Sequence, residues 1–417
     1  MREMKDSGVQ WIGEIPIEWA IDNPKYHFTQ RKDRAKQGMV QLTASQKYGV
    51  ITQTEYMEKT GANIVTVQKD FDILKLVCAG DFVIHMRSFQ GGLEYSEKTG
   101  SISSAYVMLI PHNTIREPRY YKWFFKSSNY IDALSSTSNL VRDGQAMRWA
   151  NFIQLPIPFP PANEQQRIAD FLDAKCAEID ALTSDIQTQI DTLEQYKRSV
   201  ITETVTKGLN PDAEMKDSGV FYMAPMNATW RLTKIGYICS KLSRSFAPED
   251  TALICSNKGK VQVRADDLTG IMVSDDNAMQ GIRSGDIAIH GMDTWHGAIA
   301  LSEYDGKITR VVHVCDSTED KRFIVYYMQH LAFQGVYKLI SNGVRGNTSD
   351  FRSWDKVRDI WIAIPETKEE QAAICDYLDS QCTAVEEVIA TKKEQLEVLG
   401  EYKKSLIFEY VTGKKEV

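Results

Sequence analysis

EQQRIADFLD occupies residues 164–173, and EQAAICDYLD occupies residues 370–379, which lie 206 positions later. The same offset relates QYKRSVITETVT at 195–206 to EYKKSLIFEYVT at 401–412. Proteins built from stacked small units repeat every 20 to 50 residues or about that, so a longer offset indicates duplication of a whole domain together with its helix. We expect each half of the chain to perform the same task once.

Both repeated stretches show the seven-residue spacing of apolar side chains that is typical of a coiled coil. The first helix is expected to have one seam of Leu172, Ile179, Ile186, Leu193 and Val200, and a second of Ile168, Leu182 and Tyr196. The corresponding seams of the second helix are Leu378, Val385, Lys392, Leu399 and Leu406, and Ile374, Val388 and Tyr402. Polar residues at Lys175, Gln189, Lys392 and Gln395 either extend to solvent at a wet edge or fix the register of pairing.

Capping signals mark the ends of both expected helices. An N-terminal capping side chain followed by an acid or amide three residues later, and a C-terminal glycine, occur at both helices. These residues are Asn163 with Gln166, Thr367 with Glu370, Gly208 and Gly413. A helix of about 45 residues is about 65 Å long, so each helix is expected to act as a spacer.

The connection between the halves predicts how the helices pair. A short segment with Asn210 and Pro211 separates the first helix from MKDSGV at 215–220, the second copy of residues 4–9. The second domain is then expected at the far end of the first helix, and the second helix must run back antiparallel. The predicted fold is α+β: two globular α/β domains separated by two long antiparallel coiled-coil helices, with pseudo-twofold symmetry. The expected parts are 1–161, 162–207, 208–365 and 366–417.

Within the globular parts, short apolar runs separated by Gly-Asp pairs indicate strands and tight turns. The runs are 76–78, 82–84 and 287–289, and the Gly-Asp turns are 80–81 and 285–286. Residues 119–126 and 322–331 have the apolar spacing of short amphipathic helices.

Charge is divided unevenly along the chain. Residues 1–161 have a net charge of +3 and residues 208–365 a net charge of −1, whereas 162–207 and 366–417 have −4 and −5. No segment is basic enough for charge alone to predict DNA binding. Seven Cys without a CxxC pair indicate reduced thiols, and no apolar run has the length of a membrane span, so we expect a cytoplasmic protein.

The motifs of common enzymes are missing from the sequence. There is no phosphate-binding G-x-x-x-x-G-K-[ST] loop and no Asn-Pro-Pro-Tyr or Asp-Pro-Pro-Tyr tetrapeptide. Glu401 and Lys403 have a nuclease-like spacing but lie on a heptad helix without a second acid. His290 with His296, and His313 with Cys315, lack further metal ligands at the usual spacing. We therefore expect no catalytic residue and no metal site in this chain.

Several coincident motifs resemble one family of proteins. They are MKDSGVQWIGEIPIEW at 4–19, its second copy MKDSGVFYMAPMNATW at 215–230, GDIAIHGMDTWHGAIALSEYDG at 285–306, NFIQLPIPFPPANEQQRIADFLD at 151–173 and VRDIWIAIPETKEEQAAICDYLD at 357–379. These stretches are similar to the specificity subunit of a type I restriction-modification system. The likeness covers essentially the whole chain.

The resemblance implies a function and a set of partners. In that family, two target-recognition domains each read one half of a bipartite double-stranded DNA sequence in the major groove, and paired helices fix the gap between the halves. The helices also dock two copies of an adenine DNA methyltransferase subunit, and the complete endonuclease adds ATP-driven translocase subunits. S-adenosylmethionine, Mg and ATP are accordingly expected only in partner subunits. Because the two domains differ in sequence, the target is expected to be asymmetric.

Three segments in each domain concentrate side chains suited to base or phosphate contacts, which are Arg, Lys, Asn, Gln and hydroxyl groups. The predicted DNA-binding residues of the first domain are Ser45, Gln46, Lys47, Tyr48, Arg87, Ser88, Gln90, Arg142, Gln145 and Arg148. Those of the second domain are Lys258, Lys260, Arg264, Asp293, Trp295, His296, Arg345, Asn347 and Arg352. The predicted partner-docking residues are Gln165, Asp170, Phe171, Asp376 and Tyr377.

Each of these assignments has a simpler alternative. A loop Arg is often an ion-paired surface group, a turn Trp often packs into its own domain, and a turn Asp often caps local backbone. A different class of function also fits the pattern, namely a coiled-coil adaptor with two protein-binding domains and no DNA role. A self-contained nuclease is disfavoured because the sequence lacks a cluster of metal-binding carboxylates.

Overall fold

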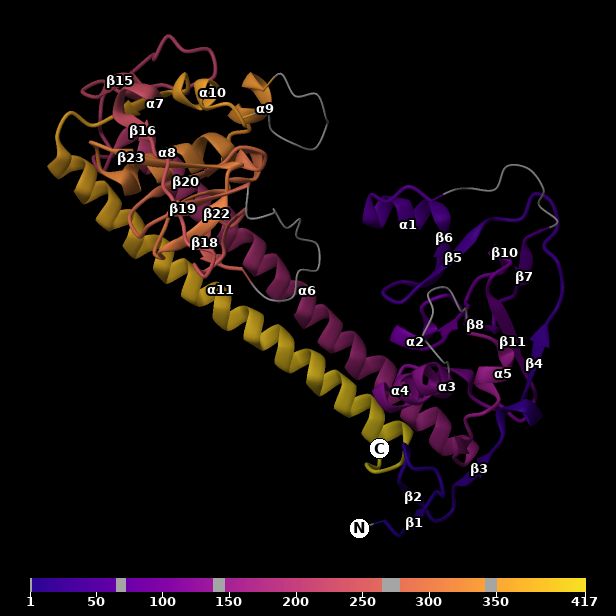
Figure 1. Ribbon diagram of the computed structural model, residues 1–417. Helices are drawn as coiled ribbons and strands as arrows, with labels where there is room; N and C mark the ends of the chain where they lie inside the picture. The colour runs from indigo at the N-terminus through magenta and orange to yellow at the C-terminus, as the bar shows by residue number, and fades with distance from the viewer. Residues whose placement is uncertain (1, 65–72, 138–146, 265–277, 342–350) are drawn as a thin grey trace. The chain divides into compact units, whose positions relative to one another are not determined.

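The computed structural model describes residues 2–64, 73–137, 147–264, 278–341 and 351–417. Its contacts divide the chain into unit 1 (Met1–Ile186 and Lys393–Val417) and unit 2 (Gln187–Lys392). Two long helices, α6 (Ala162–Lys207) and α11 (Lys368–Val411), contribute to both units. Figure 1 labels these elements on the ribbon.

Unit 1 contains a four-stranded antiparallel sheet in the order β4-β11-β8-β9, with two-stranded pairs β1-β2, β3-β12, β5-β6 and β7-β10. The strands are β1 (Met4–Asp6), β2 (Glu14–Pro16), β3 (Ala20–Asp22), β4 (Phe28–Arg31), β5 (Leu42–Ser45), β6 (Gly49–Thr52), β7 (Lys75–Val77), β8 (Phe82–Ile84), β9 (Glu94–Tyr95), β10 (Gly100–Ile102), β11 (Val107–Pro111) and β12 (Ile157–Phe159). The helices are α1 (Gln53–Thr60), α2 (Ser88–Gly91), α3 (Pro118–Phe124), α4 (Ser128–Ser136) and α5 (Trp149–Phe152).

Unit 2 repeats this topology with the sheet order β16-β23-β20-β21 and the pairs β13-β14, β15-β24, β17-β18 and β19-β22. Its strands are β13 (Met215–Lys216), β14 (Met226–Asn227), β15 (Arg231–Lys234), β16 (Cys239–Lys241), β17 (Leu253–Ser256), β18 (Lys260–Val263), β19 (Met279–Ile282), β20 (Ile287–His290), β21 (Ile299–Leu301), β22 (Gly306–Thr309), β23 (Val312–Ser317) and β24 (Trp361–Ile364). Its helices are α7 (Ile235–Ile238), α8 (Lys321–Phe333), α9 (Val336–Ile340) and α10 (Trp354–Arg358), with the short 3-10 helix η4 (Thr294–His296). The predicted duplication and the mixed helix–strand class are confirmed.

The repeat extends to hydrogen bonds around the Gly-Asp turns. Arg31 Nε donates to Asp81 Oδ2 at 2.7 Å, and Arg244 Nη2 donates to Asp286 Oδ1 at 2.9 Å. The glycine before each Asp has a positive φ of 96° or 84°, a backbone conformation that favours residues without a Cβ. Both predicted turns are therefore present, and each places an Asp where it accepts hydrogen bonds from an Arg of a distant segment.

The long helices pair antiparallel within each unit, as predicted. In unit 1, Leu172 near the start of α6 shares a buried core with Leu406 near the end of α11. In unit 2 the reverse holds, because Val205 at the end of α6 packs in a core with Ile374 at the start of α11. Burial of these apolar side chains supplies the favourable free energy of pairing.

One predicted seam is wrong by one residue. Leu182, Tyr196, Val388 and Tyr402 are 48%, 50%, 45% and 54% exposed. The buried positions are instead four residues after the first seam, at Cys176, Ile190, Cys382 and Ile389. Ile168 and Ile374, which belong to the predicted second seam, are buried because each long helix is covered on more than one side near its start. Their burial therefore does not extend along the rest of that seam. Lys175, Gln189 and Gln395 are accordingly exposed, and Lys392 Nζ donates to Gln189 Oε1 at 2.5 Å.

The capping predictions are mostly correct. Thr367 Oγ1 accepts a hydrogen bond from Glu370 N, and Gly208 and Gly413 adopt the left-handed conformation that closes each helix. Asn163 is not the N-cap of α6, since the helix begins at Ala162 and Glu164 N donates to Pro161 O. Pro161 stands just before the first helical residue, where its missing N–H would have no intrahelical partner.

Buried His330 in α8 makes the stability of unit 2 depend on pH. Its Nδ1 lies 3.1 Å from Thr202 Oγ1 of α6, and burial lowers the pKa of His330 to about 4. A histidine in the unfolded chain has a pKa of about 6.5, so the unfolded state binds the proton more readily. The neutral His330 ring therefore contributes about 3 kcal/mol to the free energy of unfolding. This contribution is complete above pH 6.5 and is lost as the pH falls towards 4.

We expect His330→Gln to remove this acid sensitivity. Denaturant unfolding of the wild type and the variant at pH 7 and pH 4.5 measures the difference, with exposed His296→Gln as the matched control. Equal acid destabilisation of the wild type and His330→Gln would contradict the assignment.

Candidate nucleic-acid interface

Two of the three predicted DNA-binding segments of the first domain are in contact. The turn of the β5-β6 hairpin reaches the turn at 85–92, where Gln46 Nε2 donates to Arg87 O at 3.0 Å. Gly91 approaches the same side chain so closely that a Cβ on it would lie 2.6 Å from Gln46 Cγ. The exposed polar side chains of this surface are Gln46, Lys47, Arg87 and Gln90. Their amide and cationic groups can contact base edges or phosphates.

Other predicted residues of this surface have internal roles. Ser88 is fully buried, and its hydroxyl accepts a hydrogen bond from His85 N at 2.9 Å, so Ser88 stabilises the turn. Ser45 is half-buried in β5. The Lys47 ammonium lies 5.3 Å from the centre of the Tyr48 ring, a cation–π distance.

The third segment of the first domain is described only at its end. Arg142 and Gln145 lie outside the described residues. Arg148 is exposed, and its backbone N–H donates to Asn151 Oδ1 at 3.0 Å at the start of α5.

In the second domain, the hairpin of β17 and β18 carries the first predicted segment. Lys258 is exposed in the turn, whereas Lys260 Nζ pairs with Glu386 Oε2 of α11 at 2.6 Å. Arg264 is half-buried, and its N–H donates to Ala252 O at 2.8 Å. Lys260 thus ties the hairpin to the helix.

A histidine organises the second segment of this domain. His290 Nδ1 accepts a hydrogen bond from Asp293 N at 3.1 Å and lies 3.2 Å from Asp293 Oδ2, while burial lowers the pKa of His290. His296 is exposed beyond the turn. Trp295 packs against the core of its own domain, with Lys338 Nζ 5.7 Å from the ring centre. Trp295 thus packs within its own domain, and its contact with DNA stays a prediction.

The described end of the third segment reaches the same turn. Arg352 Nη2 lies 3.1 Å from Met292 Sδ, and Phe351 N donates to Gly291 O at 3.0 Å. Arg345 and Asn347 lie outside the described residues. Among the residues that the structure describes, no group of three His, Cys, Asp or Glu side chains is arranged to hold a metal ion.

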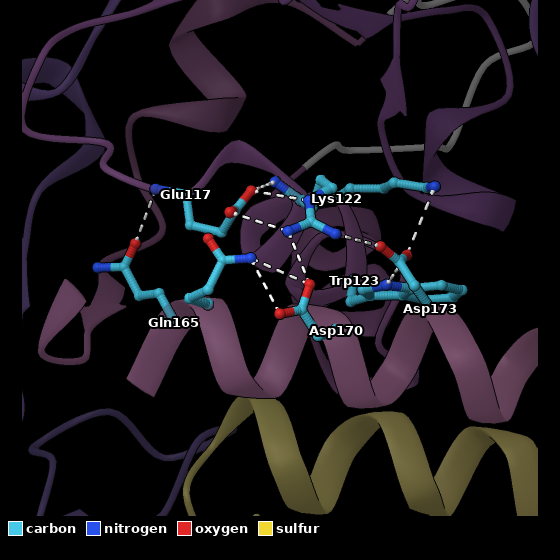
Figure 2. Close-up of polar contacts among 8 residues, drawn as sticks. Glu117, Lys122, Trp123, Gln165, Asp170 and Asp173 are labelled. Atoms are coloured by element: carbon cyan, nitrogen blue, oxygen red, sulfur yellow. Dashed lines mark hydrogen bonds and ion pairs between the residues drawn. The ribbon is translucent and has the colours of Figure 1, made fainter. Parts of the chain in front are cut away.

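A duplicated joint connects each domain to a long helix, and the sequence reasoning missed it. Arg119 Nη2 pairs with Asp170 Oδ1 at 2.8 Å and its Nη1 with Asp173 Oδ2 at 3.0 Å, while Trp123 Nε1 donates to Asp173 Oδ1 at 2.8 Å (Figure 2). Hydrogen bonds from Gln166 and Arg119 lower the pKa of Asp170. Charge-assisted bonds of this kind fix both distance and orientation.

Unit 2 contains the same joint with related residues. Arg322 Nη1 pairs with both Asp376 and Asp379 at 2.8 Å, and Tyr326 OH donates to Asp379 Oδ1 at 2.6 Å. A second duplicated bond joins Trp19 Nε1 to Glu164 and Trp230 Nε1 to Glu370, both at 2.9 Å. The signal for these pairs was present in the sequence, because Trp19 and Trp230 end the two MKDSGV-containing repeats.

The joint involves most of the residues predicted to dock partners. Gln165 is buried and accepts a hydrogen bond from Glu117 N at 3.2 Å (Figure 2). Phe171 lies 4.4 Å from Tyr410 between ring centres, which joins α6 to α11. Asp170 and Asp376 bind the arginines of the joint, whereas Tyr377 is 41% exposed. Partner docking by these five residues stays a prediction.

No helix among the described residues is long and apolar enough to cross a membrane. The structure resembles a chain from work on complex assembly and conformational transition of the type I R-M system, with 14% identity, a TM-score of 0.65 and coverage of 96% of this chain and 99% of the other. The HsdS subunit of Thermoanaerobacter tengcongensis has 14% identity, a TM-score of 0.47 and coverage of 96% and 98%. The S subunit of the M. genitalium type I system has 13% identity, a TM-score of 0.39 and coverage of 94% and 96%.

The first of these likenesses shows a shared fold over nearly the whole chain. No curated protein gives a significant sequence match. A family model described as the type I restriction modification DNA specificity domain matches residues 24–192, which include the β5-β6 hairpin, the turn at 85–92 and the joint with α6. The family that the repeated motifs resemble is therefore also the one whose model matches residues 24–192, which are less than half of the chain.

Proposed function

We propose that the chain reads a bipartite, asymmetric DNA sequence for a type I restriction-modification complex, one half-site with each domain. One observation carries this proposal: two domains with the same strand order and the same helix joint present different polar side chains on equivalent turns. Arg87 and Gln90 are exposed on one turn, and Asp293 and His296 lie on the other. Different donors and acceptors at equivalent places select different bases.

The long helices are proposed to set the gap between the half-sites. Each is a continuous helix, of 46 residues for α6 and 44 for α11. At 1.5 Å per residue, such helices are about 65–70 Å long. The antiparallel pairing within each unit supports a rigid spacer, because paired apolar seams resist bending more than a single helix does.

Catalysis is proposed to lie in partner subunits. The chain would recruit two copies of an adenine DNA methyltransferase and, in the complete endonuclease, ATP-driven translocase subunits, within the cytoplasm. S-adenosylmethionine, Mg and ATP would bind those partners and not this chain. The duplicated joint supports two copies of one partner, since it gives each unit the same polar and apolar groups at the start of a long helix.

Exposed apolar residues give each unit a candidate docking patch. In unit 1, Leu182 and Tyr402 lie within two residues of the ion pair between Asp180 and Lys403, whose Oδ1 and Nζ are 2.6 Å apart. In unit 2, Tyr196 and Val388 lie beside the equivalent pair, in which Lys197 Nζ is 2.5 Å from Glu386 Oε1. Since 206 positions relate each residue to its counterpart, the two patches are copies of one surface.

Substitution of one patch should remove one methyltransferase copy. We expect Leu182→Glu with Tyr402→Glu to leave a complex with a single methyltransferase, because charged groups at the centre of an interface are costly to desolvate. Tyr196→Glu with Val388→Glu is the matched variant, and the four substitutions together should leave none. Native mass spectrometry gives the subunit ratio, and two bound copies in every variant would contradict these patches.

The isolated chain is expected to bind DNA weakly. Contacts with DNA phosphates dominate affinity because they release counterions, and a chain with a net charge of −7 can make few such contacts. The methyltransferase copies should therefore supply most of the phosphate contacts. Competition binding with cognate and random duplexes, with and without the methyltransferase, tests the proposed function. Sequence preference only in the complex supports it. An adaptor without a DNA role would show no preference in either case, and tight, salt-insensitive binding by the chain alone would contradict our expectation.

A further inference from the structure

A buried ionic array lies beneath the first domain's reading turn. Lys126, just after α3, forms a short contact from its Nζ to Glu94 Oε1 in β9, and the same Nζ donates to Gly91 O at 2.9 Å. Glu94 Oε1 also lies 3.6 Å from His85 Nε2. The side chains of Glu94 and His85 are 3% and 5% exposed. Such a buried carboxylate would be costly without its cationic partner.

The array connects to the backbone that carries Arg87. His85 Nδ1 accepts a hydrogen bond from Arg87 N at 3.3 Å, so the proton of the neutral ring belongs on Nε2, which faces Glu94. Glu94 therefore lies beside His85 without a hydrogen bond between them, and Lys126 reaches the main chain of the turn directly at Gly91 O.

Close packing leaves the turn little freedom of its own. Gly92 has a φ of +74°, and a Cβ there would lie 1.9 Å from Phe125 O. Ser88 is buried beneath the turn, while Arg87 and Gln90 point to solvent as exposed side chains. A rigid turn that exposes a cation and an amide suits base contacts, which need side chains placed to within about 0.5 Å.

The second domain lacks this array at equivalent positions. The strand pairings place Glu94 opposite Val83 and Ala300 opposite Ala288, so Ala300 occupies the place of Glu94. Gln329 corresponds to Lys126, because it lies three residues after Tyr326 of the joint as Lys126 does after Trp123. Its Nε2 donates to Ile299 O at 2.7 Å, a neutral hydrogen bond in place of the ion pair.

We infer that Lys126 and Glu94 are positioning residues that set the geometry of the turn at 85–92 and thereby the sequence preference at the first half-site. This inference rests on the proposed function for its effect on DNA. Its effect on the turn is independent of DNA.

The test is the double variant E94A/K126Q, which installs the residues of the second domain and leaves no unpaired buried charge. Glu94→Gln alone would leave Lys126 unpaired and endanger folding, so it is a secondary variant. Lys122→Gln, in α3 and facing Asp173 of the joint at 3.9 Å, is the control.

Hydrogen exchange of the full chain, followed by mass spectrometry, measures protection of the Ser88, Gln90 and Gly92 amides. Methylation by the complex of duplexes with single base changes measures discrimination in each half-site.

We expect E94A/K126Q to lose protection in this turn only and to lose about tenfold discrimination or more in the first half-site, with the second half-site unchanged. Unchanged protection in the folded double variant would overturn the inference, as would equal loss of discrimination in both half-sites. If the wild-type complex shows no sequence preference while protection of the turn falls, the positioning role stands and the proposed function fails.

Discussion

Exchange of residues 1–161 for the corresponding domain of another specificity chain is expected to change one half of the DNA target and leave the other half unchanged. Each mismatched base pair costs about 1–3 kcal/mol, so several mismatches in the original first half-site should lower binding by about a thousandfold or more. The reason is that each unit has its own core and its own joint, so neither reading surface depends on the side chains of the other. Methylation of duplex libraries randomised in either half measures the change.

The joint decides how the exchanged domain must be designed. An incoming domain needs the equivalents of Arg119 and Trp123, because Asp170 and Asp173 on α6 otherwise lose their partners. A matched control replaces residues 1–161 but keeps Arg119 and Trp123 in place. Change in both half-sites, or in neither, from a folded exchange protein would contradict independent reading by the two domains.

Insertion of four residues into both long helices is expected to widen the gap and leave both half-sites unchanged. Four residues add about 6 Å of helix, which is between one and two base-pair steps of about 3.4 Å. The insertions belong after Gln189 and after Lys392, whose side chains are hydrogen-bonded at 2.5 Å and therefore lie at the same level of the pair. Methylation of a duplex series with stepped gaps should show loss of the original spacing and gain of a longer one.

Insertion into one helix alone is the control for this experiment. It displaces one apolar seam relative to the other, so we expect lower thermal stability and weak methylation at every gap. A double insertion that changes the preferred bases, or that leaves the original gap preferred, would contradict the role of the helices as a spacer.

The sequence predicted the long helices and the duplication well because their signals are local and repeated. Seven-residue apolar spacing and Gly208 and Gly413 mark the helices without reference to the rest of the fold. The second seam was misplaced because Ile168 and Ala169, near the start of α6, are both buried. Buried residues at two adjacent positions fit two different seven-residue registers. Only the exposure of Leu182 and Tyr196 decides between them.

The candidate site was less predictable because side chains of one chemical type have different roles. Lys258 and Lys260 are alike in sequence, yet Lys260 pairs with Glu386, which lies 126 positions later. Ser88 and Arg87 are neighbours, but the serine faces inward and the arginine faces solvent. The joint was missed for the same reason, since the role of Arg119 depends on pairing with carboxylates about 50 positions away on α6. Contacts of this range depend on the tertiary fold and not on local spacing.

The most direct test of the central claim is to sequence methylated adenines in cells that express the methyltransferase with and without this chain. Two unlike reading domains on one spacer predict a single asymmetric motif in two parts, separated by a gap of constant length, that disappears without the chain. A contiguous or palindromic motif, a gap of variable length, or methylation that persists without the chain would contradict it.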